Sequence, residues 1–108
     1  MTYWLPAVLM RVRRCVVQGQ VRFTFKALEE LALLDMGLDI DDVCDILSRV
    51  RTRNSAGRIA SESTGDWLYV FKMPVFGIPI YVKPLLRNDC LVVSFHEDTG
   101  GTHDRDSH

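Results

Sequence analysis

Residues 65 to 97 read GDWLYVFKMPVFGIPIYVKPLLRNDCLVVSFHE, and this stretch decides the fold. It contains three apolar runs rich in aromatic and β-branched residues, Trp67 to Met73, Ile78 to Leu86 and Cys90 to Glu97. Pro74 and Gly77 interrupt the chain after the first run, and a polar Arg-Asn-Asp turn separates the second run from the third. Apolar runs of this length between turn residues predict β-strands. The stretch therefore predicts a three-stranded antiparallel meander.

The residues before the meander predict three helices that cover one face of the sheet. The first spans residues 6 to 18, with Pro6 at its first position and Gly19 as its C-terminal cap. Thr24 caps the second helix, and Asp39 with Asp42 three residues later resembles a capping box for the third. The residues expected to be buried are Leu5, Leu9, Val12 and Val16 in the first helix, Ala27, Leu28, Leu31 and Ala32 in the second, and Ile40, Val43, Ile46, Leu47 and Val50 in the third.

The segments around the helices predict connectors and ends. Val21 to Phe25 alternates in polarity, which predicts a short extended connector. Arg49, Arg51 and Arg53 come where cations complement the C-terminus of the third helix. Residues 52 to 66 predict a mobile loop with at most one short strand, around Gly57 to Ser63. Residues 98 to 108 lack apolar anchors and predict a disordered tail. We therefore expect one α+β domain over residues 1 to 97, with N-terminal helices packed on a twisted antiparallel β-sheet.

The composition is that of an ordinary globular domain. The chain has 108 residues, of which 47% are hydrophobic and 25% charged, so it can form one core and no second domain. A net charge of -1 argues against binding nucleic acid by bulk attraction but leaves room for a local basic face. Cys15, Cys44 and Cys90 lie far apart, which predicts reduced thiols. No apolar segment is long enough for a signal peptide or a membrane span, which predicts a cytoplasmic protein without a membrane partner.

A small basic set of residues carries the chemistry that the sequence predicts. Walker loop, GxGxxG, HExxH and GxSxG motifs are absent from the sequence, and we expect no metal and no cofactor. The set consists of Arg58, Lys72, Tyr81, Lys83, Arg87 and His96. Its cations, phenol and imidazole are the groups that metal-independent RNA cleavage requires. A base takes the ribose 2′-OH proton, cations stabilise the phosphorane, and an acid protonates the leaving 5′ oxygen.

Strand alternation assigns roles within this set. His96 shares a face with Ser94 and is expected to lie beside Tyr81 or Lys83 on the neighbouring strand. We predict His96 as the general base and Tyr81 or Lys83 as the donor to the transition state. Arg58, in the mobile loop, is expected to grip the scissile phosphate. The residues predicted to bind RNA are Lys72, Arg87 and Ser94.

Each of these roles has a simpler alternative. Arg58 can be an exposed arginine that contributes nothing, and His96 can be a solvated histidine at a strand end, paired with Glu97 or Asp98.

Five pieces of the chain, taken in order, resemble the MqsR family of bacterial toxin–antitoxin mRNA interferases, members of the RelE-like toxin superfamily. They are GQVRFTFKAL, MGLDIDDVCDIL, WLYVFKMP, IYVK and CLVVSFHE, and the resemblance covers residues 8 to 97. It implies a toxin that cleaves messenger RNA without metal to arrest growth. It also implies silencing by a cognate antitoxin, a DNA-binding protein encoded by the adjacent gene.

The resemblance also carries individual positions across. The family's YxK pair is Tyr81 and Lys83, and its SF pair is Ser94 and Phe95. The family's Trp67 is kept, while four family residues are replaced: lysines by Arg58 and His96, a glutamine by Leu68 and an arginine by Lys72. Cations replaced by cations keep phosphate affinity, whereas a leucine cannot form a hydrogen bond. An imidazole titrates closer to neutral pH than an ammonium group, which suits proton transfer.

Two other functions are consistent with the same residues. One is a catalytically degraded RelE-like module that only binds a partner protein or RNA. The other is a small scaffold in which Lys72, Lys83 and Arg87 keep the sheet soluble and discourage pairing at its edges. Pro79 and Pro84 favour the scaffold, because proline in a strand marks an edge, a start or a bulge.

Overall fold

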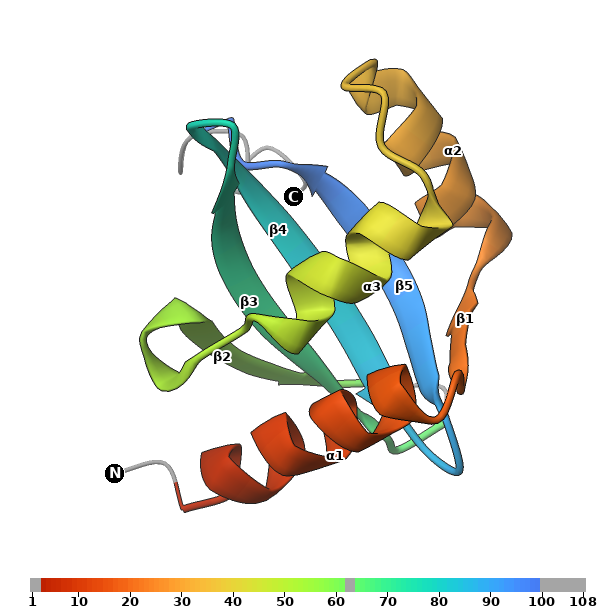
Figure 1. Ribbon diagram of the computed structural model, residues 1–108. Helices are drawn as coiled ribbons and strands as arrows, with labels where there is room; N and C mark the ends of the chain where they lie inside the picture. Colours follow the sequence, from red (N-terminus) through yellow and green to blue (C-terminus); the bar gives the residue numbers. More distant parts are fainter. Residues whose placement is uncertain (1–2, 62–63, 100–108) are drawn as a thin grey trace.

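The computed structural model describes residues 3–61 and 64–99, and in it three helices pack on a five-stranded sheet. The elements are α1 (Leu5–Val17), β1 (Val21–Phe23), α2 (Phe25–Leu34), α3 (Ile40–Ser48), a single 3-10 turn η1 (Thr52–Asn54), β2 (Ser55–Ala60), β3 (Trp67–Val75), β4 (Ile78–Leu86) and β5 (Cys90–Glu97). Figure 1 shows α1 and α3 on one side of the sheet and α2 beside the edge formed by β1 and β5. The predicted α+β fold is confirmed.

The meander forms the centre of the sheet, whose strand order is β1-β5-β4-β3-β2. β3 pairs antiparallel with β4, and β4 pairs antiparallel with β5, as the sequence predicts. The strand β4, which carries Pro79 and Pro84, is therefore the central strand and not an edge. Pro84 follows Lys83 at a register shift between β4 and β5, where a residue without an N–H donor disturbs the ladder least. Because both prolines lie on the central strand, they do not mark an edge of the sheet and no longer favour the scaffold.

The connector before α2 is a fifth strand of the sheet, which makes the sheet mixed. β1 pairs parallel with β5, with Val21 opposite Cys90 and Phe23 opposite Val92. Backbone hydrogen bonds continue the ladder on both sides, from the Cys90 N–H to the Gln20 carbonyl and from the Thr24 N–H to the Val92 carbonyl. Alternation along the segment indicates an extended backbone but gives neither its partner nor its direction, so this pairing was not predicted.

Local signals at the helix ends are confirmed. Pro6 lies in the first turn of α1, and Gly19 follows that helix with a φ of 69°, which a side chain would disfavour. The Thr24 hydroxyl accepts a hydrogen bond from the Ala27 N–H at 3.0 Å. Asp39 and Asp42 form a reciprocal capping box, each side chain accepting from the backbone N–H of the other at 2.9 Å. Side-chain chemistry thus sets where these helices begin and end.

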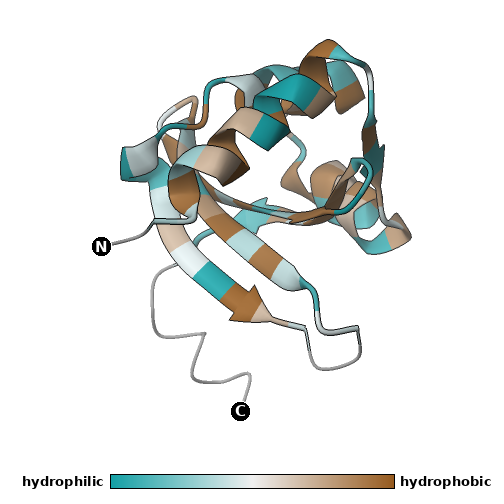
Figure 2. Ribbon diagram, turned by 90° about the horizontal axis from the view of Figure 1, so that it is seen from below, coloured by the Kyte–Doolittle hydropathy of each residue, from teal (hydrophilic) through white to brown (hydrophobic). Residues whose placement is uncertain are grey.

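The core lies between the helices and one face of the sheet. Phe71, Val82 and Phe95 stand opposite one another on β3, β4 and β5, and all three have no exposed surface. Burying such side chains contributes about 1.5 to 3 kcal/mol each. The helices contribute Leu5, Val8, Leu9, Val12, Ala27, Leu31, Val43 and Leu47 to the same cluster. In Figure 2, hydrophobic and paler residues alternate along the strands, as a sheet with one buried face requires.

Part of the predicted helix burial is wrong. Leu28 is 38% exposed, Ile40 is 46% exposed and Ala32 is exposed as well. Ile40 is the first residue of α3. For Leu28 and Ala32 the reason is geometric, because α2 lies against the edge of β5 and covers it with a narrow side. A helix that meets an edge buries fewer residues than one lying across a face, and the apolar pattern alone does not distinguish the two cases.

The segment between α3 and the meander is more ordered than predicted. Residues 55 to 60 form β2, which pairs antiparallel with β3 from Ser55 opposite Phe71 to Ala60 opposite Trp67. This strand starts before the predicted one and includes Arg58, so the placement of Arg58 in a mobile loop is wrong. Residues 62 and 63 of the predicted loop lie outside the described residues.

The C-terminal boundary of the folded part differs from the predicted one by at least one residue. The Asp98 N–H donates to the Pro79 carbonyl at 2.8 Å, and the Asp98 carboxylate pairs with Lys72. Asp98 is thus part of the domain, since a hydrogen bond and an ion pair hold it against β3 and β4. Residues 100–108 of the predicted tail lie outside the described residues.

Two further expectations concern the state of the three cysteines and the presence of a membrane span. Cys15, Cys44 and Cys90 are free thiols, as predicted, and Cys15 and Cys90 are buried. In the described part of the chain, the helices are too short and too polar to cross a membrane.

Candidate functional site

A row of polar side chains crosses the middle of the sheet on the face turned away from α1 and α3, called the open face. Lys72 on β3 stands opposite Tyr81 on β4, and Tyr81 stands opposite His96 on β5. Each of these residues neighbours a core residue in sequence, so alternation turns its side chain to the open face. Lys83 lies two residues after Tyr81 and shares that face. We call Lys72, Tyr81, Lys83 and His96 the strip.

Tyr81 is the centre of the strip. Its ring centroid lies 5.7 Å from that of His96, with the planes tilted by 52°. The ammonium nitrogens of Lys72 and Lys83 also lie 5.7 Å each from the Tyr81 ring centroid, one on β3 and one on β4. The phenol is therefore flanked by two cations and an imidazole, within the range of favourable cation–ring contact. The sequence predicted that His96 lies beside Tyr81 or Lys83, and the structure places it beside Tyr81.

His96 contacts the backbone of the residue that follows it. Nδ1 lies 3.0 Å from the backbone carbonyl oxygen of Glu97. A carbonyl oxygen only accepts, so this contact is a hydrogen bond in the tautomer that carries its hydrogen on Nδ1. In the neutral imidazole, Nε2 then keeps a lone pair that can accept a proton.

An acidic side chain from beyond β5 holds one cation of the strip. The Asp98 carboxylate lies 2.8 Å from the Lys72 Nζ, and the Asp98 side chain is only 8% exposed. The hydrogen bond and charge of Asp98 raise the pKa of Lys72 above its ordinary value. Lys72 is thus charged and already paired with a carboxylate.

Ser94 lies opposite Lys83 but is not an exposed member of the strip, since it is only 2% exposed. Its hydroxyl donates to Glu30 Oε1 at 2.8 Å and accepts from Lys26 Nζ at 3.1 Å. The same Glu30 oxygen accepts the Phe95 N–H at 2.9 Å, at a point where β5 has no strand on its outer side. Glu30 therefore joins α2 to the edge of β5.

The pKa of Glu30 reflects this position. Burial acts to raise the pKa, but hydrogen bonds from Phe95, Lys26 and Ser94 outweigh burial and lower the pKa below its ordinary value. The group is a charged anchor for β5. Sequence reasoning missed Glu30 and Lys26, although their spacing of four residues on one helix is a signal for a paired face.

Arg58 does not join the strip. It stands opposite Tyr69, three residues before Lys72, and so lies on the other face of the sheet. Its guanidinium carbon lies 3.8 Å from the Trp67 ring centroid and 4.8 Å from that of Trp4. Arg58 thus stacks against two indoles, one from β3 and one from the residue before α1. Its predicted role at the scissile phosphate stays a prediction, and this stacking gives it a structural role as well.

Arg87 is also separate from the strip. It lies in the turn between β4 and β5, and its Nε and Nη2 donate to Asp66 Oδ2 at 3.1 and 2.6 Å. The Arg87 guanidinium holds the pKa of Asp66 below its ordinary value. This pair joins two turns at one end of the sheet. RNA binding by Arg87 remains a prediction that needs the RNA to extend along β4.

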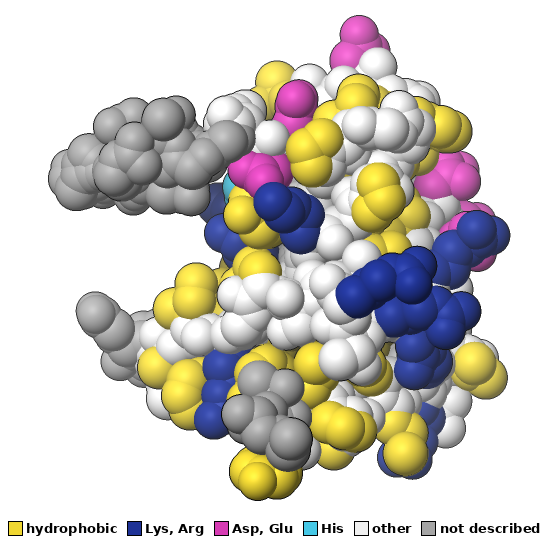
Figure 3. Space-filling view, turned by 90° about the vertical axis from the view of Figure 1, so that its left-hand side faces the viewer, with side chains coloured by type: hydrophobic (Ala, Val, Ile, Leu, Met, Phe, Trp, Pro, Cys, Tyr) yellow, Lys and Arg dark blue, Asp and Glu magenta, His cyan; other side chains and the backbone are white. Residues whose placement is uncertain are grey.

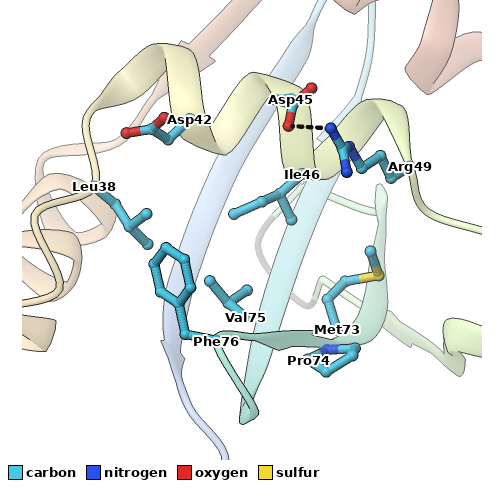
Figure 4. Close-up of a pocket in the computed structure, with 9 residues that line it drawn as sticks. All are labelled: Leu38, Asp42, Asp45, Ile46, Arg49, Met73, Pro74, Val75 and Phe76. Carbon is cyan, nitrogen blue, oxygen red and sulfur yellow. Dashed lines mark ion pairs between the residues drawn. The ribbon is translucent and has the colours of Figure 1, made fainter.

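Two surface depressions lie on the other side of β3, against α3. One is a groove of about 230 Å³ lined mainly by apolar residues, among them Leu38, Ile46, Val75 and Phe76, with Asp42, Asp45 and Arg49 also lining it. Figure 4 shows the Asp45–Arg49 ion pair on α3, with Met73 and Pro74 on the facing strand. The second depression is lined by Arg49, Arg51, Arg53, Asn54, Met73 and Pro74.

Fold and site together define a small α+β domain that carries two lysines, a phenol and an imidazole in one strip on the open face of its sheet. Among the described residues, no three His, Cys, Asp or Glu side chains gather where they could hold a metal ion. A family model described as "Motility quorum-sensing regulator, toxin of MqsA" matches residues 6–97. The chain therefore belongs to the MqsR toxin family, which confirms the resemblance. No curated protein matches it.

Membership of this family has two consequences. The chain is a toxin of a toxin–antitoxin system, and its partner is a cognate antitoxin of the MqsA kind. The chemistry by which the toxin acts has to be argued from the strip.

Proposed function

We propose that this toxin is an endoribonuclease that cleaves messenger RNA without a metal ion and so arrests growth. The observation that carries the proposal is the strip itself. Three strands bring Lys72, Tyr81 and His96 into one row, with Lys83 beside them. The strip supplies a base, cations and a second proton donor, the groups that RNA cleavage by its own 2′-OH requires.

The first step is proton removal by His96. Nε2 accepts the proton of the ribose 2′-OH, and the resulting oxygen attacks the adjacent phosphorus. The Nδ1–H bond to the Glu97 carbonyl orients the imidazole and stabilises the imidazolium that forms. A positioned general base contributes about 10² to 10⁴ to the rate.

The second step is charge stabilisation and departure of the leaving group. The Lys83 ammonium, 5.7 Å from the Tyr81 ring centroid, offsets the negative charge of the phosphorane. The Tyr81 hydroxyl donates its proton toward the 5′ oxygen as the phosphorus–oxygen bond breaks. The products are a 2′,3′-cyclic phosphate and a free 5′-OH, and the proton gained by His96 returns to solvent or to the phenolate.

Lys72 binds a flanking phosphate after exchanging its carboxylate partner. Asp98 holds the Lys72 ammonium in the described state, so RNA has to replace one oxyanion by another. The Lys72 ammonium is 48% exposed and open to a phosphate, but the Asp98 carboxylate is only 8% exposed, so the exchange also requires that carboxylate to be rehydrated. Ser94, buried behind Lys83, positions β5 through Glu30.

The alternative is a module of the same fold that binds RNA or a partner but does not cleave. We propose cytoplasmic action, where messenger RNA is found, and silencing by an antitoxin encoded by the adjacent gene. Membership of the MqsR toxin family and the proposed substrate support both proposals.

The test is direct. Purified toxin, freed of antitoxin, is incubated with single-stranded RNA in EDTA, and the ends of the products are analysed. The proposal predicts fragments with 2′,3′-cyclic phosphate and 5′-OH ends. Intact RNA together with measurable RNA binding would establish the binding module instead.

A further inference from the structure

A second group of cations lies at the edge of the sheet, outside the strip. α3 ends at Ser48, and Arg49, Arg51 and Arg53 follow it. Together with Asn54, Met73 and Pro74 they line one surface depression of about 480 Å³, which we call the arginine hollow. Figure 3 views this side of the molecule and shows several Lys and Arg side chains gathered together. The hollow therefore presents positive charge to solvent.

The sequence predicted that these arginines complement the C-terminus of α3, but the structure shows that they are not needed there. The N–H groups of Arg49 and Val50 donate to the Ile46 and Leu47 carbonyls, and the Ser48 hydroxyl donates to the Asp45 carbonyl, so no arginine side chain is needed at this helix end. Arg49 pairs with Asp45 at 3.1 Å, but both side chains are largely exposed, so solvent screens this pair. Within residues 3–61 and 64–99, Arg51 and Arg53 form no ion pair. Three guanidinium groups around one hollow repel one another, which favours an anionic ligand.

The hollow is continuous with the strip across one strand. The Asn54 side-chain amide donates to the Lys72 carbonyl at 3.1 Å, which fixes η1 against β3. Lys72 directly precedes Met73 and Pro74, which line the hollow. β2 pairs with β3 only as far as Phe71, so in the described part of the chain no strand covers the edge of β3 beyond that point. Because η1 occupies the edge at Lys72 itself, a flexible polymer would pass from the hollow over Met73 and Pro74 to reach the Lys72 side chain.

We infer that the arginine hollow binds backbone phosphates of single-stranded RNA that flank the bond to be cleaved. The inference rests on the proposed function and deepens it by extending the substrate beyond the strip. Guanidinium groups bind phosphate through paired N–H donors and read no base, so the contribution is independent of sequence. A single strand fits because its backbone can bend over a strand edge, whereas a duplex cannot follow so tight a path. An acidic protein segment is the rival ligand.

The test measures the salt dependence of RNA binding. The parent protein carries His96→Ala to prevent cleavage, and the probe is a labelled single-stranded RNA of about 20 nucleotides, followed by fluorescence anisotropy between low and moderate NaCl. The test variant adds Arg51→Ser and Arg53→Ser. The control adds Arg11→Ser and Arg14→Ser on α1, which changes the net charge equally. Thermal midpoints of all three proteins are compared.

The hollow predicts a change confined to the test variant. Losing two phosphate contacts lowers the slope of log Kd against log [NaCl] by about 1.4, because each contact to a single strand contributes about 0.7. The control variant should keep the parent slope. With His96 restored, the test variant should cleave a trinucleotide at the wild-type rate, because so short a substrate does not reach the hollow.

Other outcomes overturn the inference. Equal slopes in the test variant and the parent would exclude phosphate binding at the hollow. Unchanged RNA binding together with weaker binding of the cognate antitoxin would assign the hollow to the protein partner. If the parent binds RNA but the wild-type protein does not cleave it, only the proposed function is contradicted. The salt-dependence slopes then still show whether the hollow binds phosphate. If the parent binds no RNA, both the proposed function and the inference about the hollow are contradicted.

Discussion

Replacing Glu30 by alanine should destabilise the protein, because this side chain joins α2 to the edge of β5. The Glu30 carboxylate accepts the Phe95 N–H and the Ser94 hydroxyl, and Ser94 is only 2% exposed. Hydrogen bonds to a charged group are worth about 1.5 to 3 kcal/mol each, and an abandoned buried donor costs a similar amount. The third contact, with Lys26, is exposed and contributes little.

From these contacts we expect Glu30→Ala to lower the free energy of unfolding by about 2 to 3 kcal/mol, allowing for water that enters at the strand edge. For a domain of this size that is a fall of roughly 10 to 20 °C in the thermal midpoint. The assay is thermal and urea unfolding followed by circular dichroism. Glu29→Ala removes the same charge one residue away, at an exposed position, and should change stability by about 0.5 kcal/mol or less.

The pH dependence of the same variant provides a second readout. The pKa of Glu30 is lowered in the folded state, so its carboxylate contributes stability above the ordinary pKa of 4.5 and loses it as the pH falls through the lowered value. The stability difference between wild type and Glu30→Ala should therefore shrink at acid pH. Equal midpoints for Glu30→Ala and Glu29→Ala at neutral pH would refute the role of Glu30 as the anchor of β5.

Three further predictions concern other residues. Asp98→Asn removes the carboxylate that pairs with Lys72 and should tighten binding of single-stranded RNA about two- to fivefold. The control, Glu97→Gln, makes an equal charge change at an exposed position and should not tighten binding. Equal dissociation constants for the two variants would show that Asp98 does not compete with phosphate. Arg58→Ala should lower the free energy of unfolding by about 1 to 2 kcal/mol and alter tryptophan fluorescence, because it removes a cation stacked on two indoles. If Arg58→Ala instead abolished cleavage at unchanged stability, Arg58 would have the catalytic role that the sequence predicts. Burial raises the pKa of Cys90 to about 12, so with a thiol reagent at about pH 8 the half-buried Cys44 should react well before Cys90. Simultaneous modification of both in the native protein would contradict this order.

Local features of the fold could be predicted from the sequence. The capping hydroxyl of Thr24, the Asp39–Asp42 box and the turn between β4 and β5 each act within a few residues, and the structure has them where expected. The first turn of the meander comes later than predicted, because β3 continues through Pro74, which pairs with Pro79. Alternation along β4 and β5 also placed Tyr81 beside His96, because two strands joined by a short turn leave little freedom of register.

Features that depend on distant partners could not be predicted. The parallel pairing of β1 with β5 joins residues about seventy positions apart, and nothing within Val21 to Phe23 specifies it. Ser94 alternates like an exposed residue, yet α2 covers it, since the path of the chain after β1 places Glu30 there. Arg58 was assigned to a loop because Gly, Ser and Thr surround it, and its stacking partners come from Trp4 and Trp67. In each case tertiary packing overrides the local pattern.

The most direct test of the central claim is the rate at which His96→Ala cleaves RNA under single-turnover conditions, in EDTA, at neutral pH. The account predicts a loss of about 10² to 10⁴ relative to the wild type, because the base that accepts the 2′-OH proton is gone. The thermal midpoint should stay within a few degrees, since His96 lies on the open face of the sheet. A variant that folds normally and cleaves at the wild-type rate would contradict general base catalysis by the strip.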